Sequence, residues 1–121
     1  MVSILEKSME YFESFNKQNL DELREMFSEN VTLRDWEISV SGIDDVLEAN
    51  SKIFSSVDSI SVTPIMVYEG VDKFLMGPLE VEGVVIVEME VLINEKETLL
   101  VIDILEFDKD YKIKSIKAYK G

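Results

Sequence analysis

Apolar side chains recur at helical spacing through the first half of the chain. Between residues 2 and 16, Ile4, Tyr11 and Phe15 share one face, which predicts an amphipathic helix. After Gly42 the apolar positions again repeat every three or four residues, and acidic side chains stand where they favour a helix N-terminus. The pattern therefore predicts one helix at the start of the chain and another after Gly42.

The region between these helices carries two further signals. Asn19 and Glu22 have the spacing of a capping box, in which Asn19 is the N-cap of a short helix and Glu22 reaches back to it. The alternation from Val31 to Asp35 then predicts a brief strand.

The second half of the chain has the period of strands. Pro64 indicates an edge strand or a bulge, and Gly77-Pro78 predicts a turn. The predicted strands cover residues 59–69, 83–93, 98–107 and 112–119, with hairpin turns at 94–97 and 108–111. Helices followed by an antiparallel meander describe an α+β fold, and 121 residues suit one domain over 1–121.

One strand contains a polar residue at an apolar position. On the odd positions of 98–107, Asp103 stands between Val101 and Leu105, and the even positions are mostly apolar as well. Burial among such neighbours would raise the pKa of the Asp103 carboxyl and favour its protonated form. Three structural explanations stay open: pairing with Lys or Arg, a solvent-exposed strand edge, or hydrogen bonds from backbone amides.

Composition removes several classes of function. Twelve basic residues against 25 acidic ones give a net charge of −13, which argues against nucleic-acid binding and against anionic membrane surfaces. The chain has neither Cys nor His, so disulfides, thiolate nucleophiles, imidazole bases and His-ligated metals are excluded. Acid–base chemistry must therefore come from Asp, Glu, Tyr or Lys.

Hydropathy predicts a cytoplasmic protein. The longest uncharged stretch runs from Ser59 to Tyr68, which is too short to span a bilayer. The first residues also lack the basic start and long apolar core of a signal peptide.

Several segments together resemble a known superfamily. The likeness covers nearly the whole chain and is carried by residues 11–21, 26–35 and 99–119, together with Gly42 before the third helix. These segments resemble the nuclear transport factor 2-like superfamily, closest to the Δ5-3-ketosteroid isomerases and the SnoaL-like polyketide cyclases. The resemblance implies a cone-shaped (cystatin-like) fold, in which three N-terminal helices pack on a curved, mostly antiparallel sheet around a pocket.

The resemblance also implies three catalytic residues. Tyr11 matches the tyrosine that hydrogen-bonds the substrate carbonyl oxygen, and Asp35 matches the general base. Asp103 matches the protonated aspartic acid that completes the oxyanion hole. The substrate would be an apolar, carbonyl-containing small molecule, and no cofactor or metal is needed. Independently of the resemblance, Tyr11 shares the apolar helix face, and Asp35 is in phase with Val31 and Leu33.

The expected pocket has a wider lining. Trp36 follows the base where the family commonly has Pro, and Phe27 and Asn50 stand near positions at which some members carry tyrosines. The lining residues that we expect are Phe15, Phe27, Trp36, Asn50, Phe54, Met89, Val101 and Leu105.

Two other functions and one assembly complete the expectations. A polyketide cyclase-like enolate enzyme would use similar aspartates, and a non-catalytic ligand-binding or dimerisation module would use neither. If Asp103 faces the pocket, then Leu100, Ile102 and Ile104 face the convex side of the sheet. An apolar outer face needs a cover, so we expect a homodimer through the sheet.

Overall fold

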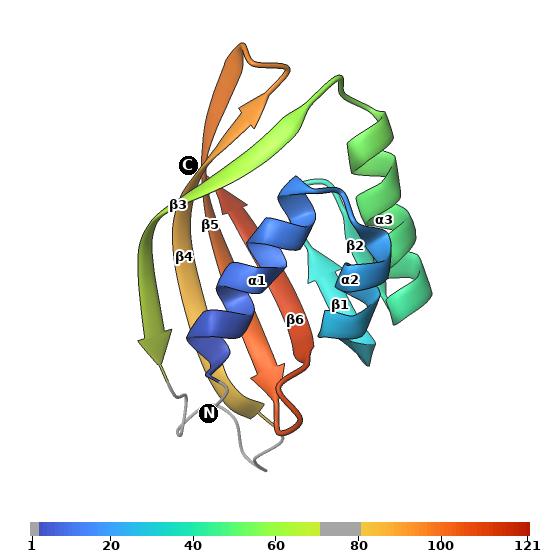
Figure 1. Cartoon of the computed structure of the whole chain (residues 1–121), viewed down its shortest axis with the longest axis vertical. Coiled ribbons are helices and arrows are strands. Elements are labelled where there is room, and N and C mark those ends of the chain that lie inside the picture. The colour runs from blue at the N-terminus through green and yellow to red at the C-terminus, as the bar shows by residue number, and fades with distance from the viewer. Residues whose placement is uncertain (1–2, 71–80) are drawn as a thin grey trace.

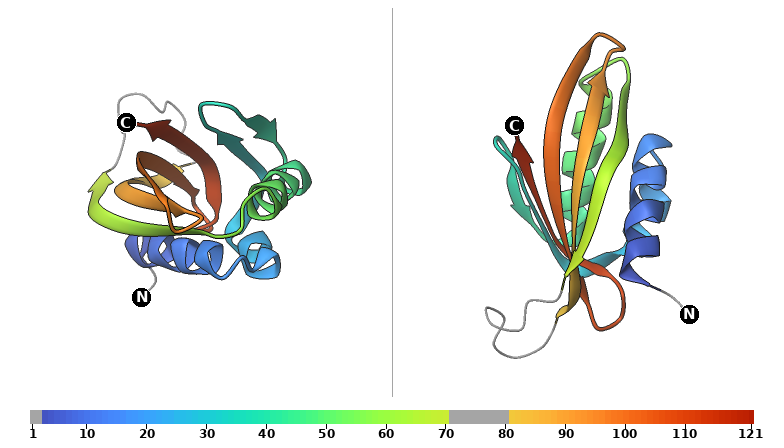
Figure 2. Two further views of the ribbon diagram at one scale, coloured as in Figure 1. Left: turned by 90° about the horizontal axis from the view of Figure 1, so that it is seen from above. Right: turned by 90° about the vertical axis from the view of Figure 1, so that its left-hand side faces the viewer.

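The computed structural model describes residues 3–70 and 81–121 and contains helices packed against one curved sheet (Figures 1 and 2). The predicted turn at Gly77-Pro78 lies outside the described residues. In chain order the elements are α1 (Ile4–Asn16), α2 (Leu20–Met26), β1 (Phe27–Arg34), β2 (Ser39–Ser41), α3 (Ile43–Ser55), β3 (Ile60–Gly70), β4 (Val81–Ile93), β5 (Glu97–Asp108) and β6 (Ile113–Lys120).

The sheet is mixed and open. Its strand order is β2-β1-β6-β5-β4-β3, with β1 and β6 parallel and every other described pair antiparallel. The predicted α+β fold with a mostly antiparallel sheet is therefore confirmed. The three-residue strand β2 was not predicted, because so short a segment shows no period of its own.

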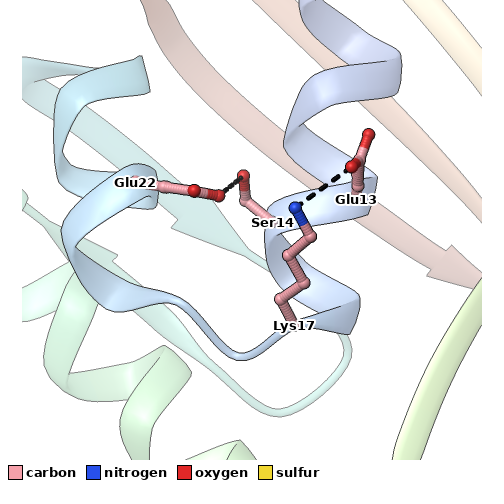
Figure 3. A network of polar contacts seen from close by, with 4 residues as sticks. All are labelled: Glu13, Ser14, Lys17 and Glu22. Atoms are coloured by element: carbon pink, nitrogen blue, oxygen red, sulfur yellow. Dashed lines mark hydrogen bonds and ion pairs between the residues drawn. The ribbon is translucent and has the colours of Figure 1, made fainter.

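Of the two interactions predicted for the start of α2, the structure contains one. Asn19 caps α2 as predicted, since its side chain accepts a hydrogen bond from the Glu22 backbone N–H at 3.1 Å. The predicted reach of the Glu22 carboxylate back to Asn19 is wrong. Glu22 Oε1 instead accepts from the Ser14 hydroxyl at 2.8 Å, which ties α2 to α1 (Figure 3).

The edge strand β3 is protected in two ways. A register shift lies between Pro64 and Met66, which confirms the bulge predicted at Pro64. Near its start, the Asn16 side chain accepts from the Val62 N–H at 2.7 Å and donates to the Val62 carbonyl at 3.0 Å. Asn16 thus replaces a neighbouring strand at this position and fixes the end of α1 against the sheet.

The two faces of the sheet have different environments. The inner face lies under the helices: α1 contacts β3 and β4, and α3 contacts β1 and β2 (Figure 1). Val85, Val87 and Leu105 on this face are fully buried. The outer face, away from the helices, keeps large apolar side chains in solvent, and Leu100 is 56% exposed. No helix in the described ranges is long and apolar enough to cross a membrane.

Candidate functional site

An apolar cavity of about 240 Å³ lies between α1, α3 and the inner face of the sheet. Tyr11 from α1, Asp103 from β5 and Asp35 from the end of β1 all line it. Most of the remaining wall is aliphatic or aromatic, including Phe12, Leu33, Ile53, Val62, Val91 and Ile116. A mostly apolar pocket with a few convergent polar groups is the usual form of a small-molecule site.

A larger groove of about 460 Å³ runs along the surface between α1, α2 and the β5–β6 turn. Its lining is mainly charged, and several of these charges already have partners. Lys17 pairs with Glu13 at 3.1 Å, and Glu22 accepts from Ser14 (Figure 3). We place the functional site in the apolar cavity, because buried ionisable groups converge there.

Tyr11 is held by aromatic packing on the inner face of α1. The rings of Phe12, Phe15 and Phe27 lie 5.1, 6.5 and 6.0 Å from its ring, measured between centroids. Burial raises the pKa of the phenol, and the charge of Asp103 adds to the effect. The Tyr11 hydroxyl therefore stays protonated and serves as a hydrogen-bond donor.

Asp103 is buried at the centre of the sheet. It lies between Val87 on β4 and Ala118 on β6, and its side chain is 5% exposed. Burial, and then the charge of Asp35, raise its pKa from 3.8 to about 7. In the part of the chain that the structure describes, Asp103 has no ion pair, no hydrogen bond and no open strand edge. The three structural explanations for this aspartate are thereby excluded within that part.

Asp35 is held differently, by a turn that begins directly after β1. Its Oδ1 accepts hydrogen bonds from the backbone N–H groups of Glu37 at 2.7 Å and Ile38 at 2.6 Å. Its own N–H donates to the Ile38 carbonyl at 2.9 Å, which closes the turn. The two amides stabilise a negative charge on this carboxylate. Oδ2 takes no part in the turn, so one oxygen is left for the cavity.

The polar ends of Tyr11 and Asp103 reach the cavity space. Neither side chain is hydrogen-bonded to another described residue. Among the described residues, every side-chain oxygen or nitrogen that has no accessible surface does have a hydrogen-bond partner. Their oxygens are therefore accessible from the cavity. The three groups are also close to one another, because the charge of Asp35 raises the pKa of Asp103 and the charge of Asp103 raises the pKa of Tyr11. A phenol, a carboxyl that can stay neutral and a carboxylate thus face one apolar space.

The structure separates the other expected lining residues into two groups. Phe15, Trp36, Asn50, Met89 and Val101 line the cavity.

Phe27, Phe54 and Leu105 do not line it. Phe27 is buried behind the Tyr11 ring, and Phe54 packs edge to face on Phe15 with 5.0 Å between ring centroids. Leu105 is fully buried between β4 and β6, next to Val85 and Ile116 in the register. Each of the three therefore lies next to a residue that lines the cavity: Tyr11, Phe15 and Ile116 respectively.

Trp36 forms part of the cavity rim. It is 43% exposed, and Lys120 Nζ lies 5.4 Å from the centroid of its ring. Such an exposed cation–π contact contributes about 0.5–1 kcal/mol and holds the indole beside the turn of Asp35. The sequence predicted that Trp36 lines the pocket. It did not predict the contact with Lys120, because Lys120 is the last residue of β6 and is far from Trp36 in the sequence.

Comparison with known proteins agrees with this architecture. Residues 9–116 match the model of the SnoaL-like domain family. Among solved structures, a candidate ketosteroid isomerase from Kribbella flavida aligns with a TM-score of 0.76 at 14% identity, covering 98% of this chain and 77% of that one. A candidate polyketide cyclase from Sinorhizobium meliloti aligns with a TM-score of 0.72 at 15% identity, covering 98% of this chain and 94% of that one.

An LEH-like epoxide hydrolase from M. tuberculosis aligns with a TM-score of 0.73 at 11% identity, covering 98% of this chain and 82% of that one. At these identities the structural likeness shows the fold alone. No curated protein matches the sequence. The family match over residues 9–116 and the shared fold establish that the chain belongs to the SnoaL-like family of nuclear transport factor 2-like proteins.

Proposed function

We propose that this protein is a cofactor-independent isomerase that moves a double bond into conjugation with a ketone in an apolar small molecule. The observation that carries the proposal is the convergence of Tyr11, Asp35 and Asp103 on one apolar cavity. Membership of a family whose structural relatives include candidate isomerases and cyclases is consistent with it.

The reaction begins with proton transfer to Asp35. Its free Oδ2 takes a proton from the carbon between the carbonyl and the double bond. The electron pair of that C–H bond moves into the π system, and negative charge develops on the carbonyl oxygen. Asp35 then returns the proton to the far end of the former double bond. Atoms and charge balance, and the product is the conjugated ketone.

Tyr11 and Asp103 stabilise the dienolate between these steps. The Tyr11 hydroxyl and the protonated carboxyl of Asp103 both donate hydrogen bonds to the oxygen on which charge develops. Burial raises the pKa of each group, so Tyr11 keeps its proton at neutral pH and Asp103 keeps its proton below about pH 7. One such donor is typically worth about 10²- to 10³-fold in rate. The apolar wall strengthens these interactions because it keeps bulk water away.

The size of the cavity narrows the substrate. Pockets for drug-sized ligands measure roughly 300–1,000 Å³, and this one holds about 240 Å³. We therefore propose a substrate whose reactive part has one or two rings. A larger molecule such as a steroid would extend past Trp36 at the rim.

An isomerisation assay tests the proposal with two ketones of different size. Cyclohex-3-enone and a Δ5-3-ketosteroid both gain ultraviolet absorbance on conjugation. We expect wild-type protein to convert the smaller ketone at least, and Asp35→Asn to lose the activity. Glu37→Gln is the matched control, because Glu37 is a further acidic residue on the cavity lining that has no role in the proposed reaction. Equal rates for wild type and Asp35→Asn would exclude Asp35 as the base. A ketone that binds tightly without conversion would favour a cyclase-like reaction instead.

We also propose that two copies of the chain associate through the outer face of the sheet. Leu100, Ile102 and Tyr119 are exposed on neighbouring strands there. Glu88 and Lys117 lie on the same face, beside Ile102 and Ile104 in the register. A face with an apolar centre and charges of both signs is self-complementary about a two-fold axis.

A further inference from the structure

Asn50 is a buried amide on the cavity wall that the proposed proton transfers do not use. It lies on the inner face of α3 and is 2% exposed. Its side chain lines the same cavity as Tyr11 and Asp103. A polar group at such a position costs stability unless something hydrogen-bonds to it.

The orientation of this amide is fixed by its own helix. Asn50 Nδ2 donates to the Val46 carbonyl oxygen, four residues earlier, at 2.9 Å. A flipped amide would place two acceptor oxygens against each other, so the nitrogen must face Val46. Oδ1 consequently points away from the helix carbonyl and is free to act as an acceptor.

Oδ1 faces the cavity space. No described residue donates a hydrogen bond to it. Among the described residues, every side-chain oxygen without accessible surface has a hydrogen-bond partner. The oxygen must therefore be accessible, and the cavity is the space that Asn50 lines. Tyr11 and protonated Asp103 supply donors for a ligand, whereas Asn50 supplies an acceptor.

We propose that Asn50 is a specificity-determining residue, which selects a ligand that carries a hydroxyl or N–H donor as well as its ketone. A ligand without a donor would bury Oδ1 unpaired, and sites built to hydrogen-bond a hydroxyl discriminate strongly against analogues that lack it. The inference rests on the proposed function only in placing a ketone at Tyr11 and Asp103.

Binding of matched ketones tests the inference. The probes are 2-tetralone, its hydroxy regioisomers, and the methyl ethers of those regioisomers, which keep the size but lose the donor. Trp36, the single tryptophan of the chain, lies at the rim and reports binding by fluorescence. We expect at least one hydroxy-tetralone to bind wild-type protein roughly 10- to 100-fold more tightly than both 2-tetralone and its own ether.

The variant Asn50→Leu should reduce that preference to about twofold or less, because leucine has similar size and no acceptor. Asn50→Ala serves the same purpose should the leucine destabilise the fold. Ser56→Ala is the matched control: Ser56 also lines the cavity, but its hydroxyl donates to the Ile53 carbonyl at 2.8 Å. This variant should keep the wild-type preference.

Three results would overturn the inference: no hydroxy-tetralone preferred by the wild type, a preference that survives in Asn50→Leu and Asn50→Ala, or an equal loss of affinity for every probe. The last result would mean that Asn50 supports the Tyr11 wall instead of contacting ligand. Deuterium exchange of the α-protons of the same ketones measures the proposed function separately. A hydroxyl preference without exchange would support the role of Asn50 while contradicting the isomerase.

Discussion

Two walls of the cavity each present an aspartate, and the two are held in opposite ways. On the turn after β1, Asp35 accepts two backbone hydrogen bonds through Oδ1 and is partly exposed. At the centre of β5, Asp103 is 5% exposed and receives no hydrogen bond from the described residues. Backbone amides stabilise a carboxylate, whereas an apolar strand stabilises a carboxylic acid.

This difference assigns a base and an acid within one small space. Both groups have the same chemistry in water, so their environments alone separate their tasks. The charge on Asp35 also helps to keep the proton on Asp103, since it is the second cause of the raised pKa. The protonation of Asp103 on one wall therefore depends on the charge of Asp35 on the other.

The largest effect should follow from changing Asp35. Asp35→Asn removes the base but keeps an Oδ1 acceptor for the Glu37 and Ile38 amides. We expect the isomerisation rate to fall about 10²- to 10⁴-fold, with thermal stability close to wild type. Asp35→Ala should lose as much activity and, in addition, about 1–2 kcal/mol of unfolding free energy, because the turn loses its acceptor. A stable Asp35→Ala would contradict the dual role of this side chain.

Tyr11→Phe should give the next largest loss. It removes one donor from the developing oxyanion and leaves the aromatic packing with Phe12 and Phe27 intact. We expect the rate to fall roughly 10²- to 10³-fold. Binding of neutral ketones, followed by Trp36 fluorescence, should change much less, because the charge develops only in the transition state. An equal weakening of binding and rate would show that Tyr11 acts in ground-state binding.

Asp103→Asn should change the pH dependence more than the rate. An amide still donates a hydrogen bond, so we expect the variant to keep activity within about tenfold of wild type below pH 7. Above pH 7 the wild type loses its donor as Asp103 ionises, and the variant does not. The measurement is the rate from pH 5 to pH 9, and a parallel decline in both proteins would contradict the role of Asp103.

The same substitution tests the linkage to stability. Folded Asp103 binds its proton more tightly than the unfolded chain, so its stabilising contribution is complete below pH 3.8 and is lost as pH rises to about 7. A pKa near 7 in place of 3.8 corresponds to roughly 4 kcal/mol of unfolding free energy. Urea unfolding should show wild type losing stability relative to Asp103→Asn across this window. A difference that is constant with pH would contradict the raised pKa.

The smallest effect on catalysis should come from the outer face. Ile102→Lys places a charge at the centre of the proposed dimer contact, on the side of β5 away from the cavity. We expect the solution mass to fall from about twice 13.9 kDa to the monomer value, with the rate changed less than about twofold. Leu5→Lys, at an exposed leucine of α1, is the control and should leave the mass unchanged. A monomeric wild type would contradict the proposed dimer.

Local signals predicted most of the elements and the position of the buried acid. The strand around Asp103 and the Asn19 cap could both be predicted, because each depends only on residues close by in the sequence. The hydrogen-bond partner of Glu22 could not be predicted from neighbouring residues, because Ser14 lies on another helix.

The lining of the cavity was predicted only in part. Phe27, Phe54 and Leu105 share the apolar character of the residues that line the cavity, so the pattern of the sequence cannot separate the two groups. The turn that Asp35 closes was also missed, although an Asp before a chain reversal is a known turn signal. The orientation of the Asn50 amide could not be predicted, since an Asn side chain can form hydrogen bonds with several nearby backbone groups.

Carbon-13 NMR titration of the aspartate carboxyls measures the pKa of Asp103, and the Asp103→Asn spectrum assigns its signal. We expect Asp103 to keep its proton until about pH 7. An Asp103 signal that titrates below pH 5 would contradict the raised pKa of this carboxyl.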